Sequence, residues 1–463
     1  MSDGAAGDAP FLAGKARPRN DDPVVLPGLT LGALTDRICA LALRERAFLW
    51  WWIALLPCAF LTVVLIASVT WLFWAGIGIW GVDWPVMWGF AILEYVWWIA
   101  IASGGTFISA LFYLMRVDWR TSTNRIAESM TLCAAACAGI FPILHLGRPW
   151  LFYWLFPYPN TMGYWPQWRS PLLWDFWAIL TYVTASVLFW YLGLIPDMAS
   201  LRDAAPTRGK QILYGVIALG FRGTSGQWRH WHATYGVLAA IMAALVCSVH
   251  SIVGLDFAGG ATIGWHSTQF PPLFIFGAFL SGFAMVIILL IPVRRLLRLE
   301  QMITGRHLDV LCRLMAVSSL ALTYSYMMDA FTTWYGAEAA ERTMFAARTT
   351  GMYWYVYWST ILFNVSLPQL MWFRRLRMNQ VVVLLVCVGV IIGMWFERYE
   401  IVVTSLHRTH LPSAWGDFHG TYWDLATLLG TVGLFFTGML LIVRLIPVVS
   451  MSEMRALVQR TKQ

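Results

Sequence analysis

The sequence predicts an all-α polytopic membrane protein with ten transmembrane helices. Hydrophobic residues make up 59% of its 463 residues and charged residues only 12%, and the mean hydropathy is +0.63. These values are typical of an integral membrane protein and not of a soluble domain. A helix needs about 20 mostly apolar residues to cross a bilayer. Runs of this kind occupy residues 48–77, 86–114, 127–146, 172–195, 232–253, 270–292, 308–331, 351–372, 380–397 and 421–446.

The apolar runs divide the chain into three parts. Residues 1–47 form an N-terminal segment, residues 48–446 form the transmembrane domain, and residues 447–463 form a C-terminal tail. In the first part, apolar residues at spacings of three and four are interleaved with arginines, which predicts a short amphipathic helix on the inner membrane surface. The apolar positions of this helix are Leu31, Leu34, Ile38 and Leu41.

Lysine and arginine are distributed asymmetrically across the predicted membrane. Cytoplasmic loops are enriched in these residues. If the N-terminus lies inside, 26 of the 32 lysines and arginines fall in inner segments. The outer ones are Arg148, Arg169, Arg342, Arg348, Arg398 and Arg408. We therefore expect both termini to be cytoplasmic, and this topology accounts for the net charge of +8 without a nucleic-acid partner.

Six ionisable side chains that are far apart in the sequence fall at the outer ends of these runs. They are His145, Arg148, Asp175, His250, Asp256 and Arg398. Gly254 is expected to end the fifth run, so that Asp256 can fold back over the bundle. Taken singly, each residue is explained by hydration or helix capping. Their convergence at one depth predicts a shared site, because charged groups near the bilayer mostly neutralise one another around a cavity.

These residue types suit the proton-coupled oxidation of a quinol. Histidine accepts or donates a proton near neutral pH, and a carboxylate can bind the second hydroxyl or take its proton. Water on the outer side would then receive the protons. We expect His145 and Asp175 to act on the quinol, with His250 and Asp256 beside them, Arg398 balancing the carboxylates, and Arg148 in a loop or docking role.

The sequence contains no motif for a redox centre of its own. It has no C-x-x-C-H sequence for covalent haem, no cysteine run for an iron–sulfur cluster and no paired histidine ladder for two haems. The seven cysteines are expected to pack as small apolar residues and not to bind metal. His145 and His250 could in principle ligate one haem, but Asp175 and Asp256 are expected at the same place. Electrons are therefore expected to leave through another subunit.

Two further acidic residues lie within predicted spans. Glu94 belongs to the outward part of the second run and Asp329 to the outer end of the seventh. Hydration at the helix end explains Asp329 equally well, whereas Glu94 lies among large apolar residues and needs a partner. Both are candidates for a proton pathway.

Three separated motifs resemble those of a known family of membrane subunits. They are His-Leu-Gly-Arg-Pro at 145–149, Ser-Pro-x-x-x-Asp at 170–175, and Ser-Val-His-Ser at 248–251 followed by Asp256. Together with the topology, they resemble the NrfD/polysulfide-reductase type, and the chain is most similar to the quinol-binding subunits of bacterial alternative complex III. The resemblance covers roughly residues 30–450.

The resemblance implies a specific architecture and function. The second to fifth and the sixth to ninth spans would form two four-helix bundles, flanked by the first and tenth. A quinol pocket, for menaquinone or ubiquinone, would lie at the outer face of the first bundle. Its residues would be His145, Asp175, His250, Asp256 and Arg398. Partners in the bacterial inner membrane would be an iron–sulfur protein, multihaem and monohaem cytochrome c subunits and a second NrfD-like subunit, with proton translocation as a further expectation.

Two other functions remain open from the sequence. A secondary transporter would bind a solute at broken helices near the membrane midplane, whereas here the polar groups gather at one face and few Gly or Pro residues interrupt the spans. A structural anchor that has lost quinol binding would not need the histidine and aspartate set.

Overall fold

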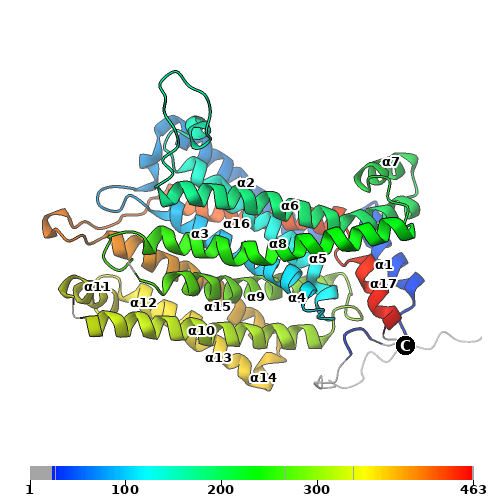
Figure 1. Ribbon diagram of the computed structural model, residues 1–463. Coiled ribbons are helices and arrows are strands. Elements are labelled where there is room, and N and C mark those ends of the chain that lie inside the picture. Colours follow the sequence, from blue (N-terminus) through cyan, green and yellow to red (C-terminus); the bar gives the residue numbers. More distant parts are fainter. Residues whose placement is uncertain (1–22, 27, 266, 337, 461–463) are drawn as a thin grey trace, which may run out of the picture.

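The computed structural model describes residues 23–26, 28–265, 267–336 and 338–460. All regular secondary structure in these residues is helical (Figure 1). Within these residues, nine helices are long and apolar enough to cross a membrane. They are α2 (Leu49–Ala75), α3 (Phe90–Thr106, prolonged by η2, Phe107–Leu111, and α4, Phe112–Leu114), α5 (Arg120–Leu144), α6 (Pro171–Ala204), α8 (Ser225–Ala258), α9 (Phe270–Leu296), α10 (Gly305–Gly336), α15 (Gln380–Tyr399, prolonged by η6, Glu400–Thr404) and α16 (Tyr422–Leu445). The predicted all-α polytopic fold is confirmed.

The tenth expected run is an interrupted helix. It comprises α12 (Trp354–Thr360), the π-helical turn η4 (Ile361–Ser366), α13 (Leu367–Gln369) and η5 (Leu370–Trp372). Pro368 lacks the N–H group that would bond to the carbonyl of Asn364 in a regular α-helix. The Ser319 hydroxyl of α10 donates to that carbonyl instead, at 2.5 Å. The neighbouring helix thus satisfies the backbone where the regular hydrogen-bond pattern fails.

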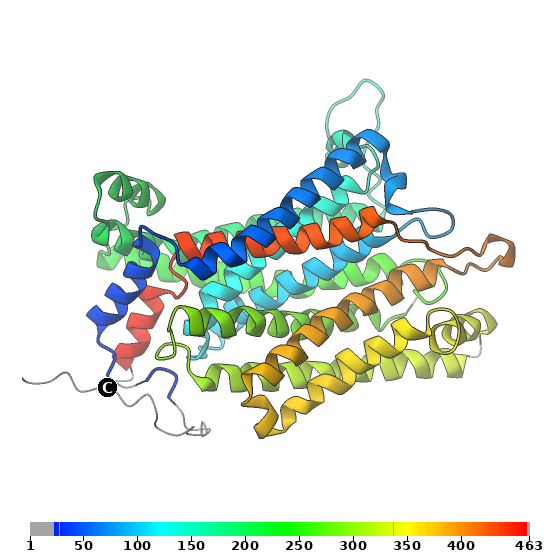
Figure 2. The ribbon, with the colours of Figure 1, turned by 180° about the vertical axis from the view of Figure 1, so that it is seen from behind.

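The crossing helices form two bundles (Figures 1 and 2). Helices α3, α5, α6 and α8 pack together as the first bundle, and α9, α10, α12–α13 and α15 as the second. Helices α2 and α16 pack along each other beside the first bundle. The bundles meet where α3 crosses α9: a Cβ atom on Gly104 would overlap the Cα atom of Gly282. Small residues allow helix backbones to approach this closely in a membrane.

The described ends of the chain lie at one end of the molecule, here called the terminal end (Figure 2). Helix α1 (Leu31–Leu43), at the predicted amphipathic segment, packs against α17 (Met451–Arg460), and α7 (Arg208–Ile217) lies at the same end. The backbone N–H groups of Met451 and Ser452 donate to Asp197 Oδ1 at 3.1 and 3.2 Å. Asp197 on α6 therefore caps the start of α17 and holds this helix against the first bundle.

The prediction that Gly254 ends the fifth helix is wrong. Helix α8 continues through Gly254 to Ala258, so Asp256 lies within its last turn. A Cβ atom on Gly254 would lie 2.9 Å from both Cα and N of Pro271 at the start of α9. The glycine therefore allows the two bundles to pack closely at this point. Asp256 is positioned by the helix itself and does not fold back in a loop.

Candidate functional site

Asp175 and Asp256 meet at the end of the first bundle that is opposite the terminal end, here called the distal end. Asp175 lies near the start of α6, after Pro171 at the first helical position, and Asp256 lies in the last turn of α8. Because α6 and α8 pack antiparallel, these two turns are neighbours. The side chains are 4% and 7% exposed, and their carboxylates interact electrostatically with each other and with the buried Tyr95 of α3. We call Asp175 and Asp256 the carboxylate pair.

The carboxylate pair retains unused hydrogen-bonding capacity. Oδ1 of Asp175 and Oδ1 of Asp256 are buried and have no hydrogen-bond partner among the described residues. A buried acceptor without a partner costs roughly 1–3 kcal/mol. Groups held in this way are suited to bind a polar ligand that supplies hydroxyl or protonated groups.

His250 presents a proton acceptor next to the second bundle. Its Nδ1 lies 3.3 Å from the carbonyl oxygen of Val246 one turn earlier. A carbonyl only accepts, so Nδ1 carries the proton in this hydrogen bond and the neutral ring leaves Nε2 as an acceptor. Nε2 is buried and has no partner in the described part of the chain. The imidazole also interacts electrostatically with Arg398.

Arg398 reaches this place from the second bundle. Its side chain is fully buried, with Cζ 4.2 Å from the centre of the Phe274 ring and Nη1 3.2 Å from Glu397 Oε1. A Cβ atom on Gly277 of α9 would lie only 3.0 Å from Arg398 Nη2. The glycine therefore leaves the space that the guanidinium occupies. The cation–π contact and the ion pair fix its position while Nε and Nη2 keep no protein acceptor within the described residues.

His145 lies apart from these contacts. It is the C-cap of α5 and is partly buried, and its Nδ1 has no hydrogen-bond partner among the described residues. The residues that follow it, Leu146, Gly147 and Arg148, line a cavity of about 630 Å³ near the end of α2. The structure thus brings Asp175 together with Asp256 and His250 together with Arg398, whereas His145 Nδ1 has no such partner in the described chain and Arg148 is exposed in the loop.

The two candidate proton-pathway acids also lie in different places. Glu94 of α3 is fully buried, has no hydrogen-bond partner for either carboxylate oxygen within the described chain, and interacts electrostatically with Asp424 of α16. Asp329 of α10 belongs to a cluster in the second bundle with Arg348 and Glu341. The two acids therefore have different charged neighbours.

Sequence reasoning missed Tyr95 and Glu397, although each is adjacent in the chain to a residue that it did identify. It also missed a buried charge network at the terminal end of the first bundle. There Arg125 bonds to Glu128 at 3.0 Å and to Asp197 at 2.8 Å, and Tyr235 donates to Glu128 at 2.8 Å. Arg125 immediately precedes the third apolar run, where an arginine is usually exposed in a loop. The only signal in the sequence for a buried ion pair was the spacing of three residues between Arg125 and Glu128.

Comparison with known proteins places the chain in a family. A family model described as polysulphide reductase, NrfD, matches residues 81–409. A protein of Halobacterium salinarum, named as a putative membrane subunit of dimethyl sulfoxide reductase, is 24% identical over 336 residues, which cover 71% of each chain. The matched residues include both helix bundles and the carboxylate pair. On this match, and in agreement with its sequence motifs, the chain belongs to the polysulphide reductase NrfD family.

Proposed function

We propose that this protein is the quinone-interacting membrane subunit of a multisubunit oxidoreductase and that quinol is oxidised at the distal end of the first bundle. The observation that carries the proposal is the buried carboxylate pair, which leaves two oxygens without protein partners among the described residues. Quinol oxidation releases two protons and two electrons, so the site needs proton acceptors at its hydroxyl groups. Asp175, Asp256 and His250 Nε2 are such acceptors.

Arg398 has a supporting role in this proposal. As protons move from the quinol, negative charge develops on its oxygens, and a fixed guanidinium stabilises that charge without having to reorganise. The ion pair with Glu397, at 3.2 Å, helps to hold the guanidinium in place. Leu146, Gly147 and Arg148, which follow His145 directly in the chain, line a cavity, and quinol that entered through it would pass close to this histidine.

We further propose which complex the subunit belongs to and how it is oriented in the membrane. Ten helical runs and the motifs at 145–149, 170–175 and 248–251 support a quinol-oxidising subunit of alternative complex III, with electrons passing to iron–sulfur and cytochrome c partners. The name of the Halobacterium relative supports a multisubunit redox complex in general. The excess of arginine and lysine in one set of loops supports cytoplasmic termini, which would place the carboxylate pair at the outer face, where protons are released.

Proton translocation is part of the proposal. Movement of protons beyond those released by quinol requires acids within the bilayer, and Glu94 is such an acid, buried beside Asp424 without a hydrogen-bond partner in the described residues. A reconstituted complex that moves no protons beyond quinol chemistry would remove this part and leave the quinol site intact.

The decisive experiment is quinol oxidation by the complex isolated with Asp175→Asn. Asparagine keeps the shape of the side chain but cannot accept the proton, so we expect turnover to fall at least about 100-fold with assembly preserved. The matched control is Asp83→Asn, because Asp83 is an exposed aspartate at the distal end. Full turnover in assembled Asp175→Asn complex would refute the proposal and favour a structural anchor.

A further inference from the structure

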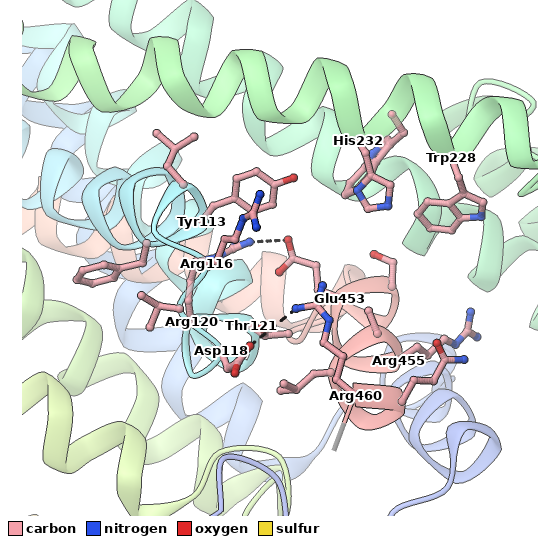
Figure 3. A pocket seen from close by; sticks show the side chains of 18 residues that line it. Tyr113, Arg116, Asp118, Arg120, Thr121, Trp228, His232, Glu453, Arg455 and Arg460 are labelled. Carbon is pink, nitrogen blue, oxygen red and sulfur yellow. Dashed lines mark hydrogen bonds and ion pairs between the residues drawn. The ribbon is translucent and has the colours of Figure 1, made fainter. Parts of the chain in front are cut away.

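A cavity of about 950 Å³ lies at the terminal end of the first bundle (Figure 3). The carboxylate pair lies at the opposite end of the same bundle. The cavity is partly open and is lined by α17, by α4 and its connection to α5, and by the start of α8. Leu114 is the last residue of one membrane-crossing helix, Arg120 is the first of the next, and Trp228 lies in the first turn of a third. Because crossing helices begin and end here, the cavity lies at the depth of the lipid headgroups.

The lining of the cavity carries an excess of positive charge. Its arginines are Arg116, Arg120, Arg455 and Arg460, and its acids are Asp118 and Glu453. Arg460 lies 3.9 Å from Asp118, but both side chains are more than half exposed, so this ion pair is weak. Arg455 donates to the neutral hydroxyl of Thr35 at 2.7 and 2.9 Å. Within the described chain, neither Arg116 nor Arg455 forms an ion pair, so the cavity holds cations that its own acids leave uncompensated.

Arg120 provides an independent indication that an acceptor belongs in the cavity. Its side chain is only 3% exposed, and its Nη2 bonds to Glu453 Oε1 at 2.6 Å. Its Nη1 is also buried and has no hydrogen-bond partner among the described residues. A buried guanidinium N–H group without an acceptor is costly. Figure 3 shows the guanidinium directed toward Glu453 within the cavity.

Most of the remaining lining is apolar or aromatic, as a lipid requires, and Thr121, Ser452 and Gln459 add polar groups. Leu114, which is 42% exposed, and Tyr113 both line the cavity. On the opposite side, Trp228 and His232 project from α8 toward α17 (Figure 3). Tryptophan and tyrosine are favoured at the headgroup layer, where one part of the ring is apolar and the other is hydrated. A free inorganic anion would not use these apolar surfaces.

We propose that this cavity binds an anionic phospholipid, with its phosphate group among Arg116, Arg120 and Arg460 and its acyl chains leaving past Leu114 into the bilayer. The phosphate would supply the acceptor that Arg120 Nη1 lacks and would neutralise the excess positive charge. Because α17 forms one wall, the lipid also links the C-terminal helix to the first bundle. This site is separate from the quinol site and does not depend on the proposed redox function.

The test is binding of short-chain phosphatidylglycerol to the delipidated complex, measured by calorimetric titration. Short-chain phosphatidylcholine is the zwitterionic probe and inorganic phosphate is the free-anion probe. We expect phosphatidylglycerol to bind at least about tenfold more tightly than either. The variant Arg116→Gln/Arg460→Gln should bind phosphatidylglycerol about tenfold more weakly. Glu453→Gln, which frees Arg120 from its ion pair, should bind phosphatidylglycerol more tightly.

The matched control is Arg208→Gln/Arg222→Gln, which removes two exposed arginines at the terminal end outside the cavity. The affinity of this control variant for phosphatidylglycerol should stay unchanged. Equal loss in this control would show that general surface charge is responsible and would overturn the proposal, as would equal binding of phosphatidylcholine. Competition by inorganic phosphate at the same concentration would overturn the lipid assignment. If the double variant does not fold, Arg116→Gln alone carries the test, with an expected loss of about threefold.

Discussion

His250 and Arg398 belong to different helix bundles, yet their side chains interact across the boundary between them. His250 is directed by α8 and Arg398 by α15, and the ring of Phe274 on α9 lies beneath the guanidinium. The second bundle therefore takes a direct part in the electrostatics of the site that the first bundle forms. A change in the packing between the bundles is expected to alter the chemistry at the distal end.

Gly277→Ala tests this link between the bundles. The added methyl group would lie 3.0 Å from Arg398 Nη2 and 2.8 Å from Met394 Cε, so the guanidinium has to shift. We expect quinol turnover to fall about tenfold while thermal stability changes little, because the ends of flexible side chains can give way. The control is Gly236→Ala in α8, where a Cβ atom would meet nothing within 4 Å. Wild-type turnover in Gly277→Ala would mean that the position of Arg398 is unimportant.

The two histidines are expected to differ in their kinetic effects. His250→Ala removes a proton acceptor whose Nε2 is buried beside Arg398, so kcat should fall about 100-fold. His145→Ala removes a partly buried side chain that immediately precedes the cavity-lining residues Leu146 to Arg148, so KM should rise as well as turnover fall. Steady-state kinetics of the two variants with a soluble quinol analogue provides the comparison. Identical effects on kcat and KM would contradict distinct roles.

Asp197→Ala is expected to destabilise the terminal end of the first bundle. The change leaves the buried Arg125 with one carboxylate fewer and removes the cap of α17. Removing one partner of a buried ion pair costs about 3–5 kcal/mol. We expect a large decrease in the melting temperature in detergent. Asp203→Ala, on the same helix, serves as the control because its ion pair with Arg202 is exposed and contributes at most about 1 kcal/mol.

Cys39 reports whether α1 is docked on α17. Burial raises the pKa of the Cys39 thiol to about 11, and its Sγ lies 3.6 Å from Met451 Sδ. The thiolate is the reactive form, so at pH 8 maleimide should modify Cys39 at least about 100-fold more slowly than an exposed cysteine. Peptide mass spectrometry can follow this residue separately. Truncation before Met451 should restore fast labelling, and rapid labelling of the intact protein would show that the two helices are not docked.

The sequence alone determined the fold class and the helical runs, and it predicted which ionisable residues lie at one end of those runs. Spans of about 20 apolar residues are a local property, as is the position of a histidine or aspartate at the end of such a span. For that reason Asp175, Asp256, His250 and Arg398 could each be assigned to one end of the bundles without knowledge of the fold. The family resemblance was carried by short motifs of the same local kind.

Only the tertiary structure decided which of these residues meet. Helix rotation and crossing are set by contacts such as that between Gly104 and Gly282, which depend on two segments distant in sequence. The packed structure brings Asp175, Asp256 and Tyr95 together within the first bundle and places Arg398 of the second bundle near His250 of the first. The packing also makes Arg125 part of a buried charge network, because a charge at the end of an apolar run is exposed or buried according to what packs over it.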